Sequence, residues 1–339
     1  MKRDILGVIG LFCLLLTNVA FAGAGQNTAL HDLKAEYERP VSIPAPDTNP
    51  LTDAKVRLGE ILFSDPRLSI DQTMSCASCH DPDFGWEDGQ QMGLGHDGSR
   101  LKRHTPTLLN LAWAPLLGWD GRFESFEDQA KSPIMSGAEM GMTSQLAAHR
   151  VHAIEGYRAM FDEAFPGEEI SLDTIAKALA SYQRTLVSPE APFDRWIQGD
   201  ETAISNSAKN GFLLFNGKAQ CAVCHTSWRF TDDGFHDIGL PHASDLGRGG
   251  IVPGVTTIQN AFKTPTLRDI AKRGPFMHDG SLKTLEDVIH HYQNGFTKRE
   301  SVSWSIKGFE LSGGEQKDLV AFLKTLTSET QTALPTLPF

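Results

Sequence analysis

The chain has 339 residues and a formal net charge of -11 at pH 7, with 31 Lys and Arg against 42 Asp and Glu. An acidic chain of this kind is repelled by the phosphates of nucleic acids and of anionic membranes, so both are excluded as main partners. A chain of this length usually needs more than one hydrophobic core, and we therefore expect two domains.

Residues 1–22 have the pattern of a secretory signal peptide. A positively charged start precedes an apolar stretch over residues 5–16 and a small-x-small cleavage site that ends at Ala22. The apolar stretch is short for a membrane span, and an uncleaved anchor is the alternative. We expect a periplasmic protein that has no membrane segment after cleavage and begins with a flexible lead-in over residues 23–50.

Helical signals dominate the rest of the chain, and no alternating run that would mark a long strand is sustained. Caps and apolar spacing predict four helices: from Thr52 to about Phe63, along an apolar face from Leu172 to Leu186, from Thr284 to a left-handed cap at Asn294-Gly295, and behind the capping box at Ser312. The fold class expected is mainly α, with long loops that wrap cofactors.

Two C-x-x-C-H motifs contain four of the five cysteines. Such motifs attach haem through two thioether bonds and present their histidine as the proximal iron ligand. A zinc site or a redox-active cysteine pair is the alternative, which two complete motifs in an exported chain disfavour. The expected attachment residues are Cys76, Cys79, Cys221 and Cys224, and the proximal ligands are His80 and His225.

The two halves of the chain repeat one pattern in register. An Asp-Gly pair follows each motif histidine, and a Thr-Pro-Thr-Leu segment and a second Asp-Gly pair follow at matching distances. The matched segments are Thr105-Pro106-Thr107-Leu108 with Thr264-Pro265-Thr266-Leu267, and Asp120-Gly121 with Asp279-Gly280. We interpret the repeat as a duplicated, cytochrome c-like haem domain that spans residues 51–190 and 191–339, with the last helix packing back on the first domain.

The register distinguishes the distal sides of the two haems. Pro133 in the first half aligns with Tyr292 in the second. Proline cannot bind iron, whereas tyrosinate can. The sequence therefore predicts one haem with an open face and one haem with two protein ligands. A tyrosine packed at a helix end is the alternative, and His290 and His291 are competing ligands.

Acid–base groups would then lie near Pro133. Gln129 and Glu139 flank it, and a carboxylate over an open haem can move the proton that cleavage of a peroxide O–O bond requires. Apolar neighbours would raise the pKa of Glu139, although a solvated surface glutamate is the ordinary alternative. Trp119 precedes an Asp-Gly turn and would relay electrons between the haems, unless it is a core indole.

On these motifs the chain resembles the bacterial di-haem cytochrome c peroxidase superfamily, which includes the MauG branch. The resemblance rests on both haem motifs, the repeated Thr-Pro-Thr-Leu, Gln129, Glu139, Trp119-Asp120-Gly121-Arg122 and Phe276-Met277-His278-Asp279-Gly280. It implies that Trp119 lies between the haems and that Gln129 and Glu139 are the distal catalytic pair. Peroxidases of the superfamily usually have methionine where this chain has Tyr292, and the tyrosine points to the MauG branch.

Two histidines depart from a simple match. His96 matches the residue that closes the first haem in resting peroxidases, so it is a further candidate ligand, or else a loop histidine. His104 stands where the family usually has an asparagine bound to calcium between the domains. Imidazole is a poor calcium ligand, so calcium is in doubt for this chain.

The resemblance implies a periplasmic oxidoreductase with two covalently bound haems c. It would use H2O2, or O2 plus electrons, to oxidise residues of a partner protein, as in tryptophan tryptophylquinone maturation of the methylamine dehydrogenase precursor, and would also meet a small redox protein. A cytochrome c peroxidase that draws electrons from a small cytochrome or copper protein is the second hypothesis. A non-enzymatic electron carrier is the third, and the open Pro133 side argues against it.

Overall fold

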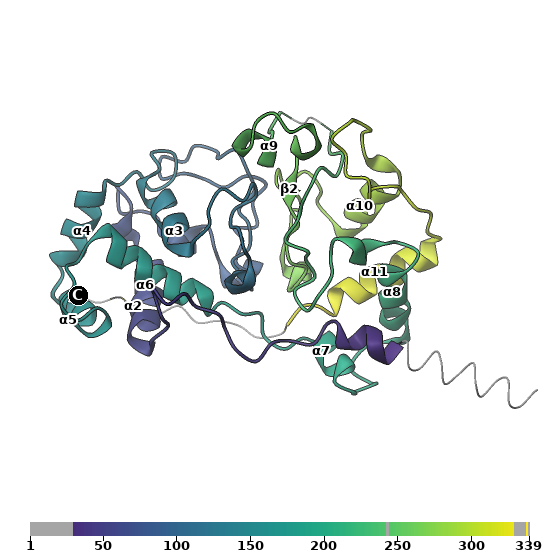
Figure 1. Ribbon diagram of the computed structural model, residues 1–339, viewed down its shortest axis with the longest axis horizontal. Helices are drawn as coiled ribbons and strands as arrows, with labels where there is room; N and C mark the ends of the chain where they lie inside the picture. Colours follow the sequence, from purple (N-terminus) through teal and green to yellow (C-terminus); the bar gives the residue numbers. More distant parts are fainter. Residues whose placement is uncertain (1–29, 242–243, 329–336, 338–339) are drawn as a thin grey trace, which may run out of the picture.

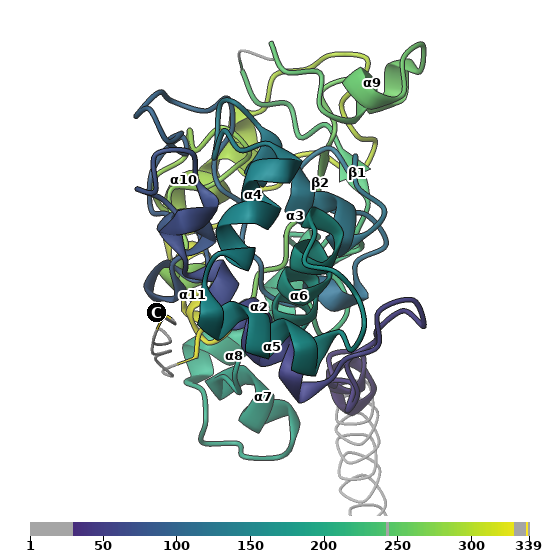
Figure 2. The same ribbon diagram turned by 90° about the vertical axis from the view of Figure 1, so that its left-hand side faces the viewer.

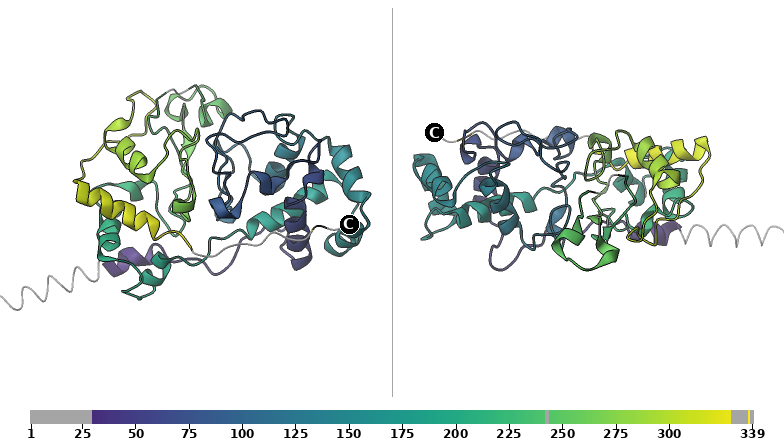
Figure 3. Two further views of the ribbon diagram at one scale, coloured as in Figure 1. Left: turned by 180° about the vertical axis from the view of Figure 1, so that it is seen from behind. Right: turned by 90° about the horizontal axis from the view of Figure 1, so that it is seen from above.

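The structure is a computed structural model that describes residues 30–241, 244–328 and 337. Two groups of helices lie side by side, with long loops between them, in Figure 1 and in both views of Figure 3. Figure 2 looks along the long axis, so that the first group stands in front of the second. The expected mainly α class is confirmed. The predicted signal peptide lies outside the described residues. Within them, no helix combines the length and apolarity needed to cross a bilayer.

The first group of helices contains α2 to α6. Its helices are α2 (Asp53–Phe63), α3 (Phe126–Met135), α4 (Ser144–His152), α5 (Glu155–Ala164) and α6 (Leu172–Arg184). Short 3-10 turns stand between α2 and α3: η1 (Pro66–Leu68), η2 (Cys76–Ser78), η3 (Pro82–Phe84) and η4 (Leu111–Trp113). The predicted start of α2 is confirmed, because the Thr52 side chain accepts a hydrogen bond from the backbone N–H of Lys55.

The second group contains the remaining elements. They are α7 (Pro192–Ile197), α8 (Asn206–Asn216), η5 (Cys221–Val223), β1 (Phe235–His236), α9 (Arg248–Ile251), η6 (Thr256–Ile258), β2 (Phe262–Lys263), η7 (Ile270–Lys272), α10 (Leu285–His290), η8 (His291–Gly295) and α11 (Gly313–Lys324). The strands β1 and β2 form one small antiparallel pair. Thr284 and Ser312 cap α10 and α11 as predicted.

The predicted left-handed cap at Asn294-Gly295 is wrong. The turn η8 that follows α10 is a π-helical turn, and Gly295 does not have a positive φ. A π-turn inserts one extra residue into the helical repeat, which side-chain spacing alone does not reveal. This turn contains Tyr292, so the deviation from regular helix lies at a residue that the sequence singles out.

One close pair of crossing helices anchors each group. In the first group α2 packs on α6, and a Cβ atom at Gly59 would lie 2.0 Å from the carbonyl oxygen of Ala178. In the second group α8 packs on α11, and a Cβ atom at Gly211 would lie 2.0 Å from the carbonyl oxygen of Asp318. The last helix, α11, therefore packs in the second group. The expectation that it packs back on the first domain is wrong, because its apolar face covers α8.

Buried apolar side chains form two main clusters, which from residue 51 onward divide between Leu186 and Phe193, whereas Tyr37 belongs to the second cluster. The first cluster is built from α2 to α6 and the loops around them, and the second from α7, α8, α10 and α11. We propose that these clusters are the cores of the two haem domains expected at residues 51–190 and 191–339.

The described part of the expected lead-in, residues 30–50, is mostly exposed and is anchored by a few buried contacts. Tyr37 is 1% exposed and stacks on Phe230 with 4.8 Å between ring centroids. Its hydroxyl donates to Asn216 Oδ1 at 2.7 Å, and Arg39 pairs with Asp194 at 3.1 Å. Single aromatic and arginine anchors hold the segment, and they leave no periodic pattern in the sequence.

Candidate functional site

Two cavities lie in the loops of the molecule, and each is lined by one C-x-x-C-H motif. The larger has a volume of about 950 Å³ and contains Cys76, Cys79 and His80 in its wall. The smaller has a volume of about 200 Å³ and is lined by the second motif. The sequence predicted these two motifs as separate haem sites, and the structure places them in separate cavities.

The first motif is a short 3-10 turn that orients His80. The turn Cys76–Ser78 begins with a capping box between Ser75 and Ser78. His80 Nδ1 donates to the carbonyl oxygen of Trp86 at 3.0 Å. This bond fixes the imidazole and leaves Nε2 as the nitrogen for iron. Burial lowers the pKa of His80, which favours the neutral imidazole that binds metals.

The second motif has the same local design. The 3-10 turn Cys221–Val223 precedes His225, whose Nδ1 donates to the carbonyl oxygen of Phe230 at 2.9 Å. Burial lowers the pKa of His225 as well. In both motifs the two cysteines form no disulfide. Two thiols beside one imidazole that is held through Nδ1 are the donor set of a haem c, so both cavities fit that group.

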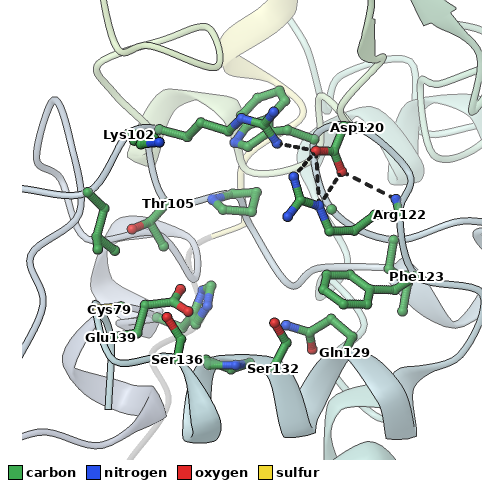
Figure 4. Close-up of a pocket in the computed structure, with 18 of the residues that line it drawn as sticks. Cys79, Lys102, Thr105, Asp120, Arg122, Phe123, Gln129, Ser132, Ser136 and Glu139 are labelled. Atoms are coloured by element: carbon green, nitrogen blue, oxygen red, sulfur yellow. Dashed lines mark hydrogen bonds and ion pairs between the residues drawn. The ribbon is translucent and has the colours of Figure 1, made fainter. Parts of the chain in front are cut away.

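The helix α3 forms one wall of the larger cavity. Ser125 caps its start, and Gln129 and Pro133 then line the cavity together with Ser132 and Ser136. Figure 4 shows Gln129, Ser132 and Ser136 standing on this helix and pointing into the same space. The sequence singled out Gln129 and Pro133 but missed the two serines. Ser132 follows Gln129 by three residues and Ser136 follows Pro133 by three, a spacing that places them on the same helical face.

Glu139 lies just beyond α3 and lines the same cavity. Its backbone N–H donates to the Ser136 carbonyl at 3.0 Å, which folds the chain back over the helix end. Figure 4 shows its carboxylate beside Cys79 and Ser136. Burial raises the pKa of the Cys79 thiol to about 11, with smaller contributions from the charges of Asp88 and Glu139. The structure thus brings Gln129, Pro133 and Glu139 together over the first motif.

His96 is not brought to this cavity. Its ring nitrogen Nδ1 lies 3.5 Å from the Asp71 carboxylate, and its Nε2 would lie 3.1 Å from a Cβ atom at Gly141. The backbone N–H of His96 donates to the Glu139 carbonyl at 2.8 Å. His96 therefore supports the Glu139 loop from behind, and its imidazole does not line the cavity.

Tyr292 lines the smaller cavity from the π-turn after α10. It lies as far beyond the cap Thr284 as Pro133 lies beyond the cap Ser125, which agrees with the register expected from the repeat. Burial raises the pKa of the Tyr292 phenol, so a phenolate there needs a nearby cation. The competing candidates His290 and His291 do not line the cavity, and His291 Nε2 donates to the Ile238 carbonyl at 2.9 Å.

Trp119 lines both cavities. Its indole Nε1 donates to the carbonyl oxygen of His104 at 2.8 Å, and its own carbonyl accepts from the Lys263 N–H at 2.8 Å. The ring lies 6.5 Å from that of His278 in an edge-to-face arrangement. The indole lies in the wall that the cavities share, and its role as an electron relay stays a prediction.

The residues around His104 do not fit calcium. His104 Nδ1 lies 2.7 Å from the carbonyl oxygen of Gln90, and Nε2 lies 3.0 Å from the Glu87 carboxylate. Both partners are acceptors, so both ring nitrogens carry protons and neither has a lone pair for a metal. Calcium also prefers oxygen ligands.

A charged rim that the sequence reasoning missed borders the larger cavity. Asp120 is 1% exposed and accepts from Arg103 at 2.7 Å and from Arg122, while Arg103 also pairs with Asp245 at 2.7 Å. Figure 4 shows Lys102, Asp120 and Arg122 on the side of the cavity opposite to α3. Trp119-Asp120-Gly121-Arg122 marks the register of the repeat and the family resemblance, but its spacing does not show that Arg103 and Arg122 pair with Asp120. Asp120 and Asp245 already neutralise the two arginines of this rim.

Comparison with known proteins identifies the family. The model of the family described as "Di-haem cytochrome c peroxidase" matches residues 53–202. The methylamine utilization protein MauG of Methylorubrum extorquens is 52% identical over 322 residues, which cover 94% of this chain and 91% of the relative. The protein of the same name from Methylophilus methylotrophus is also 52% identical, covering 86% of this chain and 88% of the relative.

More distant relatives include peroxidases. The cytochrome c551 peroxidase of Nitrosomonas europaea is 32% identical, with 94% of this chain and 91% of the relative covered. The crystal structure of a MauG-like protein associated with microbial copper homeostasis matches with a TM-score of 0.80 and 32% identity, covering 86% of this chain and 95% of that one. This chain is therefore a haem-dependent, peroxidase-like oxidoreductase that belongs to the di-haem cytochrome c peroxidase family, whose members carry two haem groups.

Proposed function

We propose that the chain is a periplasmic oxidoreductase of the MauG type that oxidises residues of a partner protein. In this proposal Cys76 and Cys79 attach one haem and the second motif attaches the other. One observation carries it: a proline faces the first cavity where a tyrosine faces the second. This pairing leaves one site open to peroxide and gives the other an anionic oxygen ligand.

The residues of the larger cavity would handle protons. The haem iron, when bound, supplies the redox chemistry there. A peroxide held between His80 and α3 lies within the space that Glu139 and Gln129 line. The Glu139 carboxylate takes the proton from the inner peroxide oxygen and returns it to the outer one, which leaves as water. The Gln129 amide donates a hydrogen bond that orients the peroxide. Pro133 offers no ligand atom, so it would not compete with peroxide at this site.

In this proposal the smaller cavity does not admit peroxide to the haem iron, because Tyr292 binds there. Tyr292 would hold the second haem through its phenol oxygen, and a bound iron(III) would supply the cation that a phenolate at this buried position needs. An anionic oxygen ligand stabilises oxidised over reduced iron, so this site is suited to hold an oxidising equivalent. Trp119, which lines both cavities, would carry electrons between them.

The partner proposed is a protein, because long-range electron transfer can oxidise a substrate that does not enter the cavity. The two relatives that are 52% identical are named for methylamine utilization. We propose the methylamine dehydrogenase precursor as substrate, with a small redox protein as electron donor when O2 replaces H2O2. The second candidate is a cytochrome c peroxidase, which the relative from Nitrosomonas europaea favours.

A two-substrate assay separates these functions. The purified holoprotein is mixed with H2O2 and either the methylamine dehydrogenase precursor or reduced cytochrome c. We expect quinone absorbance to develop in the precursor and slow turnover with cytochrome c. Fast cytochrome c oxidation without quinone formation would establish the peroxidase instead. No reaction of the holoprotein with H2O2 would leave only the electron carrier.

A further inference from the structure

The wall between the two cavities contains a buried cluster of three charged side chains, Glu87, His104 and Arg273. They are 3%, 2% and 3% exposed. Glu87 accepts from His104 Nε2 at 3.0 Å through one carboxylate oxygen and from Arg273 Nε at 2.7 Å through the other. All three line the smaller cavity, and His104 also lines the larger one.

His104 forms hydrogen bonds with four other residues of this wall. Its backbone N–H donates to the His278 carbonyl at 2.8 Å, and its carbonyl accepts from Trp119 Nε1 at 2.8 Å. Its ring donates to the Gln90 carbonyl on one side and to Glu87 on the other. Because both ring partners are acceptors, the ring is an imidazolium. One residue thus links the two halves of the chain and orients the indole that both cavities share.

We propose that His104 is a fixed cation and a positioning residue that does the work of a bound metal ion between the two haem cavities. Glu87 and the Gln90 carbonyl are oxygen donors of the kind that a divalent cation would use. Here His104 and Arg273 already occupy them. The inter-half contact and the position of Trp119 are therefore independent of calcium. This inference rests on the proposed function in one respect, namely that both cavities hold haem.

The cluster has an electrostatic consequence. In this cluster two cations, His104 and Arg273, face the Glu87 carboxylate, and Asp88 is a further carboxylate whose charge acts on His104. A positive charge disfavours the more positive, oxidised iron, and it acts strongly in a buried setting. Replacing the imidazolium by a neutral amide therefore stabilises ferric haem, and the midpoint potentials fall. A purely structural role for His104 would not produce this directed shift.

The first test uses wild-type holoprotein. The chain is dialysed against EGTA, its calcium content is measured, and the EPR spectrum and both midpoint potentials are recorded before and after addition of CaCl2. We expect less than one calcium per chain and no change in spectrum or potentials. Calcium retained at one per chain, or a spectrum that depends on EGTA, would overturn the proposal, and this result does not depend on how any variant folds.

The second test compares His104→Gln with His152→Gln, in which an exposed histidine is changed. We expect His104→Gln to raise the ferric-to-ferrous ratio of the second haem about tenfold at fixed potential, which is about 59 mV for one electron. His152→Gln should match wild type. Unchanged potentials in a folded His104→Gln protein would refute the fixed-cation role. The midpoint potentials are measured on the resting protein, so this test does not depend on the proposed function. The proposed function is tested separately, and it fails if wild-type protein does not react with H2O2.

Discussion

At the residue scale, Glu139 decides whether the larger cavity is a peroxide site. It lies over the first motif with Gln129 and Pro133, at the end of a helix that starts at a well-formed cap. We predict that Glu139→Gln keeps both haems and slows the reaction with H2O2 about a hundredfold, the scale expected for loss of a proton-transfer group. Stopped-flow absorbance measures the rate.

The matched control for Glu139 is Glu155→Gln, which changes an exposed carboxylate at the start of α5. It should react with H2O2 at the wild-type rate. A Glu139→Gln protein that also reacts at this rate would remove Glu139 from the proton path.

In the proposed function, Tyr292 sets the midpoint potential of the haem in the smaller cavity. A phenolate stabilises ferric iron, whereas a thioether favours ferrous iron. We predict that Tyr292→Met folds, since the volumes are similar and methionine adapts to irregular space, and that it raises the midpoint potential of the second haem. Redox titration followed by absorbance measures the shift, and quinone formation in the partner should fall.

The control for Tyr292 is Tyr182→Phe, which removes a hydroxyl from the first core. Its haem potentials should not move. Equal potentials in wild type and Tyr292→Met would make Tyr292 an ordinary packed side chain.

His104 gives a prediction about pH. Burial alone would lower its pKa, but the hydrogen bond and charge of Glu87 outweigh burial, and the net pKa is raised from 6.5. A raised folded-state pKa means that protonated His104 stabilises the protein fully below pH 6.5 and less as pH rises through the folded-state pKa. The difference in Tm between wild type and His104→Gln should therefore shrink on the alkaline side. A difference that grows with pH would contradict a protonated ring.

At the element scale, the crossing of α8 and α11 depends on Gly211. A Cβ atom there would lie 2.0 Å from the Asp318 carbonyl oxygen and 2.7 Å from Phe322 Cβ. We predict that Gly211→Ala destabilises the protein by about 1–3 kcal/mol, the usual cost of forced overpacking. Thermal unfolding of the holoprotein measures it.

Gly313, at the start of α11, is the matched control. A Cβ atom there meets nothing within 4 Å. Gly313→Ala should keep or slightly raise Tm, because alanine loses less backbone entropy on folding. Equal effects of the two substitutions would show that the close crossing does not matter.

The helices also show which elements a sequence can predict. Thr52, Ser171, Thr284 and Ser312 each cap a helix in the structure, because a cap is a local hydrogen bond between neighbouring residues. The π-turn at His291–Gly295 and the packed segment around Tyr37 were not predictable in this way. Both depend on contacts with distant residues, such as Phe230 for Tyr37.

The candidate site likewise contains features that the sequence predicts and features that it does not. The motifs and the register of the repeat lead to Pro133 and Tyr292, and the structure places these residues at corresponding walls. Spacing could not show that His96 turns away toward Asp71, nor that Arg103 and Arg122 meet on Asp120. These arrangements are set by loop conformations, for which the sequence carries no periodic signal.

At the scale of the whole molecule, function depends on communication between two separately built halves. The cavities belong to different hydrophobic clusters, and Trp119 lines both. A first-half carboxylate, Glu87, binds a second-half guanidinium, Arg273, in the wall beside it. Breaking one partner of a buried pair is costly, so this contact helps to hold the two halves together.

Trp119 therefore gives the last prediction, a test of that communication. Trp119→Phe removes the Nε1 donor to the His104 carbonyl and replaces an oxidisable indole by a ring that is harder to oxidise. We predict that both haems keep their resting EPR spectra and that the first site still reacts with H2O2. The spectral change of the second haem should then lag behind that of the first. Trp113→Phe, which alters an indole stacked edge-on against Trp228 at 4.8 Å, is the control and should behave as wild type. Simultaneous changes at both haems in Trp119→Phe would show that electrons cross the wall by another route, and Trp119 would then be a packing residue.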